Sequence, residues 1–212
     1  MSHVVLLGDS IFDNAAYVEP GEPDVVAQLR DRLPEPWEAT LLAVDGHEIR
    51  DVPGQLERLP RAASHLVLSV GGNDALGHVG ILEEPARSIP EALDRLAAIA
   101  DPFEAAYRRT VAALLETGLP TSLCTIYYPS FPEPLLQRLA VTALTVFNDA
   151  ILRTAFDHGL PVLDLRLICD SPADYANPIE PSAAGGTRIA DTIVEVVTSH
   201  DFDTGRTSVF TG

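Results

Sequence analysis

The sequence predicts an α/β fold built on a parallel sheet, because short apolar runs alternate with longer segments of helical periodicity. The chain has 212 residues, of which 46% are hydrophobic, so it is long enough to fill one sizeable core. It shows no internal repeat and no linker between domains. We therefore expect a single domain over residues 1–212, with a polar, peripheral tail at 200–212.

The predicted strands are short apolar runs, and the first three end at a glycine or another turn residue. They lie at residues 4–7, 39–44, 65–70, 121–127 and 161–165. Gly8, Gly46 and Gly71 follow the first three runs, where turn residues end a strand. Because parallel strands place their carboxyl ends at one edge of the sheet, the residues after each strand are expected to converge there.

The predicted helices are recognised by apolar residues at helical spacing and by their stop signals. They lie at residues 23–33, 49–59, 90–116 with a break near Asp101 and Pro102, 134–158, and 185–197. Gly118 and Gly159 follow the third and fourth helices, which is a common helix ending. Residues 77–90 are rich in glycine and proline and are expected to form a loop over a site.

The composition excludes several classes of function. The formal net charge is −17, which argues against nucleic acid or an anionic membrane as partner, since both require basic patches. The chain contains no lysine, which excludes Schiff-base and P-loop chemistry. Cys124 and Cys169 are expected to be free thiols. No signal peptide and no apolar run of about 18 residues is evident, so we expect a cytoplasmic protein without a membrane span.

Three residues at the predicted strand ends fit acyl transfer, which needs a nucleophile, donors for the developing oxyanion and a base. Ser10 follows the first strand and supplies a hydroxyl and a backbone N–H. Gly46 follows the second strand and exposes a second N–H. Asn73 follows the third strand and adds a side-chain amide. These residues are the candidate nucleophile and oxyanion donors.

The same positions resemble the motifs of the SGNH (GDSL) hydrolases. Gly8-Asp9-Ser10, Gly46 and Gly71-Gly72-Asn73-Asp74 stand where that family has its first three motifs, and the resemblance covers about residues 4–197. It implies a three-layer α/β/α fold with a flavodoxin-like parallel sheet of about five strands. It also implies hydrolysis of a small-molecule ester by the serine, with no metal and no organic cofactor.

The fourth motif departs from the family pattern. Where the family has D-x-I-H-P-S, residues 177–182 read N-P-I-E-P-S, so Asn177 replaces the Asp and Glu180 replaces the His. We hypothesise that the Asn177 amide orients Glu180, which then acts as the base. Burial raises the pKa of a carboxyl toward neutrality, whereas a salt bridge from Arg188 would lower it.

Two alternatives remain open at this stage. A displaced histidine, His78 or His47, is a second candidate for the base, since both follow strand ends. In the other alternative the protein is a catalytically inactive SGNH-fold module that binds a small molecule. Neither the ester, nor the choice between hydrolysis and acyl transfer to another acceptor, nor the oligomeric state follows from the sequence.

Overall fold

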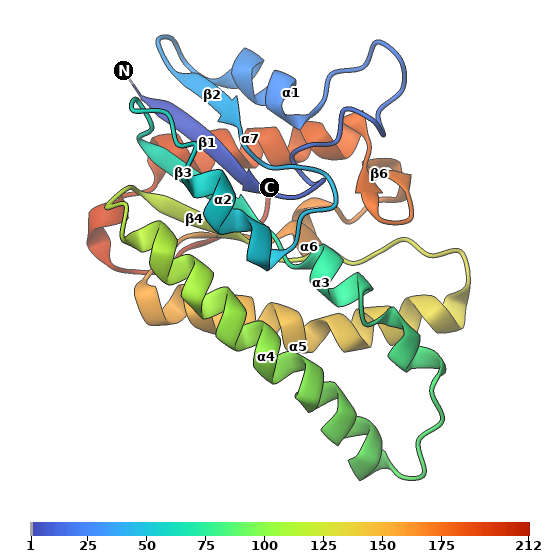
Figure 1. Cartoon of the computed structure of the whole chain (residues 1–212). Coiled ribbons are helices and arrows are strands. Elements are labelled where there is room, and N and C mark those ends of the chain that lie inside the picture. Colours follow the sequence, from blue (N-terminus) through green and yellow to red (C-terminus); the bar gives the residue numbers. More distant parts are fainter. Residues whose placement is uncertain (1) are drawn as a thin grey trace.

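The fold is organised around one parallel sheet of six strands, as seen in the computed structural model, which describes residues 2–212 (Figure 1). The strand order is β2-β1-β3-β4-β5-β8, with every neighbouring pair parallel. The strands are β1 (His3–Gly8), β2 (Glu38–Leu41), β3 (His65–Ser69), β4 (Thr121–Cys124), β5 (Val162–Leu163) and β8 (Val209–Phe210). The order of the first five is that of flavodoxin-like sheets.

Helices cover both faces of the sheet, which confirms the predicted three-layer α/β/α architecture (Figure 1). One face carries α1 (Val25–Arg32), α6 (Leu165–Ile168) and α7 (Ala183–Ser199); the other carries α2 (Val52–Leu56), α4 (Ile89–Leu115) and α5 (Pro134–His158). The remaining elements are α3 (Gly72–Leu76), the 3₁₀ turns η1 (Ile49–Asp51), η2 (Val79–Glu83), η3 (Pro172–Asp174) and η4 (Phe202–Thr204), and the antiparallel pair β6 (Tyr175–Asn177) and β7 (Glu180–Pro181).

The central strand β1 divides its side chains between the two cores. Val4 and Leu6 pack with α1 and α7, while Val5 and Leu7 pack with α4 and α5. All four are fully buried. This alternation follows from the two-residue period of a strand, and it explains why a strand covered on both faces is a continuous apolar run.

The C-terminal tail differs from the prediction of a peripheral segment and of about five strands. Val209 and Phe210 form the sixth strand and pair with Val162 and Leu163. Backbone N–H groups of Val162 and Asp164 donate to the carbonyls of Ser208 and Phe210 at 2.9 Å. The tail was missed because a two-residue edge strand in a polar segment carries no periodic signal.

One helix prediction also needs correction. The expected break near Pro102 is absent, and α4 runs on from Ile89 to Leu115. Pro102 lacks an N–H, but Phe103, Tyr107 and Val111 beyond it are buried against the sheet, and this packing outweighs the local cost.

The helix predicted over residues 134–158 is confirmed as α5. By length and composition α5 is also long and apolar enough to cross a membrane, with a mean hydropathy of 1.3 over 18 residues. Such a helix is weak evidence for a membrane span, because a core helix meets the same criterion. The inner face of α5, with Phe147 and Ile151, packs in the core beneath the sheet.

The turn after β1 requires glycine at position 8. Gly8 has φ +123°, and a Cβ atom there would lie 1.7 Å from the carbonyl oxygen of Ser69. The two strands are this close because Asp9 N–H donates to the same Ser69 carbonyl at 3.1 Å. The chain therefore turns sharply at Gly8 and presents Ser10 at the sheet edge.

We predict that Gly8→Ala destabilises the fold by at least about 3 kcal/mol, because it combines backbone strain with a clash against a strand. Gly54→Ala is the matched control, since Gly54 has no heavy atom within 4 Å of the added Cβ. Urea unfolding of both variants measures the difference. Equal midpoints for the two variants would contradict the assignment of Gly8 as an obligatory glycine.

Candidate active site

Ser10 meets Glu180 in a buried site at the carboxyl edge of the sheet. The Ser10 hydroxyl donates a hydrogen bond to Glu180 Oε1 at 3.1 Å. Both residues are only 6% exposed. Within residues 2–212 the structure gives the hydroxyl no other hydrogen-bond partner. Ser10 and Glu180 are 170 positions apart in the sequence, yet they lie within hydrogen-bond distance, as the sequence predicts.

Glu180 is held in place through the backbone carbonyls on either side of it. The Tyr127 hydroxyl donates to the carbonyl of Ile179. The buried Asn14 amide donates to the carbonyl of Pro181 at 3.2 Å, and Asn14 Oδ1 accepts from Val25 N–H at the start of α1. A third anchor ties the preceding Pro178 carbonyl to the loop after β4. The short β6–β7 pair is thus fixed to two separate segments, the stretch before α1 that contains Asn14 and the loop after β4 that contains Tyr127.

The Glu180 carboxyl has an unusual electrostatic setting. Burial raises its pKa from 4.5 to about 7; the hydrogen bond from Ser10 opposes this rise and the charge of Asp45 adds to it. Oε2 is buried with no hydrogen-bond partner among the described residues. Arg188 does not pair with Glu180 but with Asp170, at 2.8 Å. A carboxyl in this state exchanges a proton near neutral pH.

Asn177 lies opposite Glu180 in the β6–β7 pair, but its side chain bonds the backbone of the turn instead of the Glu180 carboxyl. Its Oδ1 atom accepts a hydrogen bond from the N–H of Ile179 at 2.9 Å, which shapes the turn between β6 and β7. No hydrogen bond from its amide to the Glu180 carboxyl is found in the described part of the chain. The predicted orienting contact is thus wrong, because a short polar side chain satisfies the nearby backbone first.

Of the two other candidate oxyanion donors, Asn73 shares a cavity with Ser10, whereas Gly46 lies in a loop that is bonded to the turn before Ser10. Asn73 is in α3 and lines the same cavity as Ser10. Its Nδ2 donates to the His47 carbonyl at 2.9 Å, so the amide is fixed while its second hydrogen finds no acceptor in residues 2–212. Gly46, with φ +79°, does not line the cavity. Its loop is tied to the turn by Val44 N–H, which donates to the Gly8 carbonyl at 3.1 Å.

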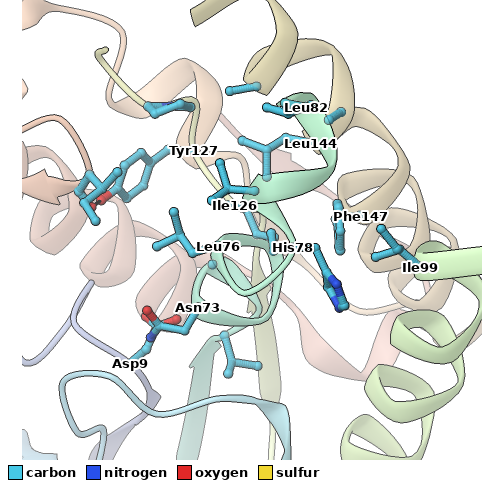
Figure 2. Close-up of a pocket in the computed structure, with 18 of the residues that line it drawn as sticks. Asp9, Asn73, Leu76, His78, Leu82, Ile99, Ile126, Tyr127, Leu144 and Phe147 are labelled. Carbon is cyan, nitrogen blue, oxygen red and sulfur yellow. Dashed lines mark hydrogen bonds between the residues drawn. The ribbon is translucent and has the colours of Figure 1, made fainter. Parts of the chain in front are cut away.

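The two alternative histidines make no hydrogen bond with Ser10. His47 Nδ1 bonds the Gln55 side chain at 2.9 Å. His78 is exposed and lies near α4, away from the end of the cavity where Asp9 and Asn73 lie (Figure 2). The geometry therefore favours Glu180 over either histidine as the partner of the serine.

A largely apolar cavity opens from Ser10 toward the space between α4 and α5. Its volume is about 110 Å³. Apolar side chains from several elements line it (Figure 2). They are Leu76 from α3, Ile99 from α4, Leu144 and Phe147 from α5, and Ile126 just after β4. Such a cavity beside a hydroxyl fits an apolar group attached to a reacting carbonyl. In residues 2–212 no three His, Cys, Asp or Glu side chains group as metal ligands.

Two functional supports escaped the sequence analysis. Gln55 is 1% exposed, and its amide both accepts from Gly8 N–H and donates to Gly8 O, each at 2.8 Å. Asn14 is also fully buried, and its side chain links Val25 to Pro181. A glutamine in a predicted helix carries no signal of burial. An asparagine after a turn is usually a local cap.

Comparisons with known proteins agree with this architecture. The model of the GDSL-like lipase/acylhydrolase family matches residues 6–188. An acetyl xylan esterase, AlAXEase, has a TM-score of 0.67 and 20% identity, over 92% of this chain and 99% of that one. An extracellular lipase from Streptomyces rimosus has a TM-score of 0.65 and 16% identity, over 94% and 100%. A lipase/acylhydrolase from Enterococcus faecalis has 0.63 and 20%, over 93% and 95%. A search of curated proteins finds no match.

The high pKa of Glu180 predicts how stability depends on pH. Below about pH 4.5 Glu180 holds its proton in both the folded and the unfolded state, and its contribution to the free energy of unfolding is fully present. This contribution is lost as the pH rises through about 7, because the folded state then has to give up the proton that the unfolded state has already lost. One pKa unit corresponds to about 1.4 kcal/mol, so the loss over this range is about 3 kcal/mol.

Glu180→Gln, which stays neutral, should therefore gain about 3 kcal/mol relative to the wild type between pH 4.5 and 8. Denaturant titrations across this range measure the gain. Glu116→Gln, an exposed substitution of the same kind, should show none. A constant difference between wild type and Glu180→Gln at all pH values would contradict the burial of a titrating carboxyl.

Proposed function

Because the chain belongs to the GDSL-like lipase/acylhydrolase family, we propose that it hydrolyses carboxylic esters with Ser10 as nucleophile and Glu180 as general base. Ester hydrolysis in general follows from the family. The observation that carries the specific assignment is the 3.1 Å hydrogen bond from the Ser10 hydroxyl to Glu180, in a buried site that opens into an apolar cavity.

In the proposed acylation step, Ser10 Oγ attacks the ester carbonyl carbon and its proton passes to Glu180. The carbonyl oxygen becomes an oxyanion, for which the N–H groups of Ser10 and Gly46 and the free amide hydrogen of Asn73 are the candidate donors. Collapse of the tetrahedral intermediate breaks the bond to the alcohol oxygen, which takes the proton from Glu180. Water then repeats the sequence on the acyl-serine, giving the carboxylic acid and restoring Ser10.

A glutamate suits the role of base only if its pKa lies near the working pH. Burial supplies that condition for Glu180, whose pKa is about 7. No arginine pairs with Glu180 in residues 2–212, so no cation holds it in the charged form. The ionised carboxylate is the active base, and we therefore expect activity to rise with pH through about 7.

The apolar cavity supports an acyl group that is aliphatic or aromatic. Ile126, Leu144 and Phe147 offer hydrocarbon surface but no hydrogen-bonding group to such a chain. Each methylene that becomes buried contributes about 0.8 kcal/mol, or roughly a fourfold gain in kcat/KM. The proposed substrates are small esters whose acyl part occupies this cavity.

We predict that Ser10→Ala abolishes hydrolysis of p-nitrophenyl esters and that Glu180→Gln lowers kcat by about 10²–10⁴-fold. A fluorophosphonate probe should label the wild type at Ser10, with the site located by peptide mass spectrometry. The control Glu116→Gln should retain full activity. Absence of both labelling and turnover from pH 5 to 9 would favour the catalytically inactive binding module.

Chain-length preference tests the assignment of the cavity. Ala143 lines it, so Ala143→Leu should fill part of the space and lower kcat/KM for octanoate esters about tenfold while sparing acetate esters. Ala98→Leu makes the same change on the exposed face of α4 and should leave the preference unaltered. If both variants keep the wild-type preference, the acyl group binds elsewhere.

A further inference from the structure

Asp9 is a second buried carboxyl beside the candidate nucleophile, and the function proposed above gives it no role. We propose that Asp9 is a positioning residue of this site that must carry its proton while Glu180 is ionised, so that the site holds a single negative charge. The inference rests on the proposed function, since it concerns the same serine and the same base.

The position of Asp9 is fixed and inward. The residue is 3% exposed and lines the cavity together with Ser10 and Asn73. Oδ1 accepts a hydrogen bond from Ile11 N–H at 3.2 Å. Oδ2 is directed toward Gly72, because a Cβ atom placed on Gly72 would lie 3.9 Å from it. Figure 2 shows Asp9 and Asn73 together at one end of the cavity.

No positive group faces Asp9 in the described part of the chain. The titratable groups around it are Glu180, Asp74, Cys124 and Tyr127. Burial keeps the pKa values of the Cys124 thiol and the Tyr127 hydroxyl well above their usual range, so both are neutral. The remaining neighbours are carboxyls. A buried carboxylate without a cation is costly, and a second one nearby raises the cost further.

The charges around Asp9 act in the same direction as its burial. Burial is the largest cause and raises its pKa from 3.8 to about 8; the hydrogen bond from Ile11 opposes this, and the charges of Glu180 and Asp74 add to it. The positive charge of Arg50 acts on Asp74, where it opposes the rise in pKa that burial causes. Asp9 therefore keeps its proton to a higher pH than Glu180 does.

This ordering of protons matters for the transition state. When Ser10 passes its proton to Glu180, the single negative charge moves from the carboxylate to the oxyanion, and the net charge of the site does not change. An ionised Asp9 would place a second negative charge beside Asn73, where the oxyanion develops. It would also make Glu180 hold its proton more tightly. The charge beside the developing oxyanion slows acylation, and the tighter hold of Glu180 on its proton slows the later transfer of that proton to the alcohol oxygen.

The experiment compares pH profiles of kcat/KM for p-nitrophenyl butyrate from pH 5.5 to 9.5. The wild type should rise through about pH 7 and fall above about pH 8, by about tenfold or more at pH 9.5. Asp9→Asn keeps the shape and stays neutral, so it should retain activity within about tenfold at pH 7.5 and lose the alkaline fall. Glu116→Gln should keep the wild-type profile.

The outcomes separate this inference from the proposed function. An unchanged alkaline fall in Asp9→Asn overturns the role of Asp9 while leaving Ser10 and Glu180 in place. Full activity in Ser10→Ala overturns the proposed function itself. A plateau in the wild type up to pH 9.5 also overturns the role of Asp9.

Infrared spectroscopy keeps the test decisive if Asp9→Asn does not fold. Glu180→Gln removes the other carboxyl of the pair, so in this variant a carbonyl band of a neutral carboxylic acid should disappear with a midpoint above pH 7. Because the charge of Glu180 raises the pKa of Asp9, the midpoint for Asp9 in Glu180→Gln should lie below that in the wild type. Absence of any such band above pH 6 means that Asp9 is ionised throughout and overturns the inference.

Discussion

The close approach of Gly8 to the Ser69 carbonyl is the constraint on which the rest of the site depends. It allows the chain to leave β1 at once, so Ser10 emerges beside the end of β3, where Asn73 begins the next turn. Gln55 closes the arrangement by bonding both backbone groups of Gly8 at 2.8 Å. Contacts to the backbone of the Gly8 turn thus place Ser10, which leaves the Ser10 hydroxyl free to bond with Glu180.

The part of the site that carries Glu180 is fixed by hydrogen bonds from side chains and loops to the backbone of the β6–β7 pair. The β6–β7 pair is too short to be stable by itself, yet its carbonyls are held by donors from Asn14, Tyr127 and the loop after β4. Among residues 2–212, these anchors leave the Glu180 carboxyl with the Ser10 hydroxyl as its one hydrogen-bond partner. Its proton affinity is therefore set by burial and by neighbouring acids, as is that of Asp9. In a chain with a net charge of −17, a site without a cation is consistent with the whole composition.

The sequence was most informative where a feature has a period or lies at a strand end, although Gly46 at the end of the second predicted strand does not line the cavity. Alternating apolar runs predicted the three layers, and the rule that parallel strand ends converge predicted that Ser10, Asn73 and Glu180 meet. It was insufficient where a tertiary contact decides. The burial of Gln55 depends on the position of α2 over β1. The continuity of α4 through Pro102 depends on aromatic packing farther along the helix. Neither contact has a local signature.

Asn177 shows why the replacements at the fourth motif belong together. The Asn177 side chain accepts the Ile179 N–H, and an aspartate could accept the same hydrogen bond, so the turn itself does not require asparagine. An aspartate would, however, add a carboxylate to the hairpin that carries Glu180, next to a proposed base that pairs with no cation within residues 2–212. Once a glutamate replaces the histidine at 180, asparagine keeps the turn and removes the extra charge. The paired change is what electrostatics favours for a working carboxylate base, whereas an inactive binding site has no such requirement.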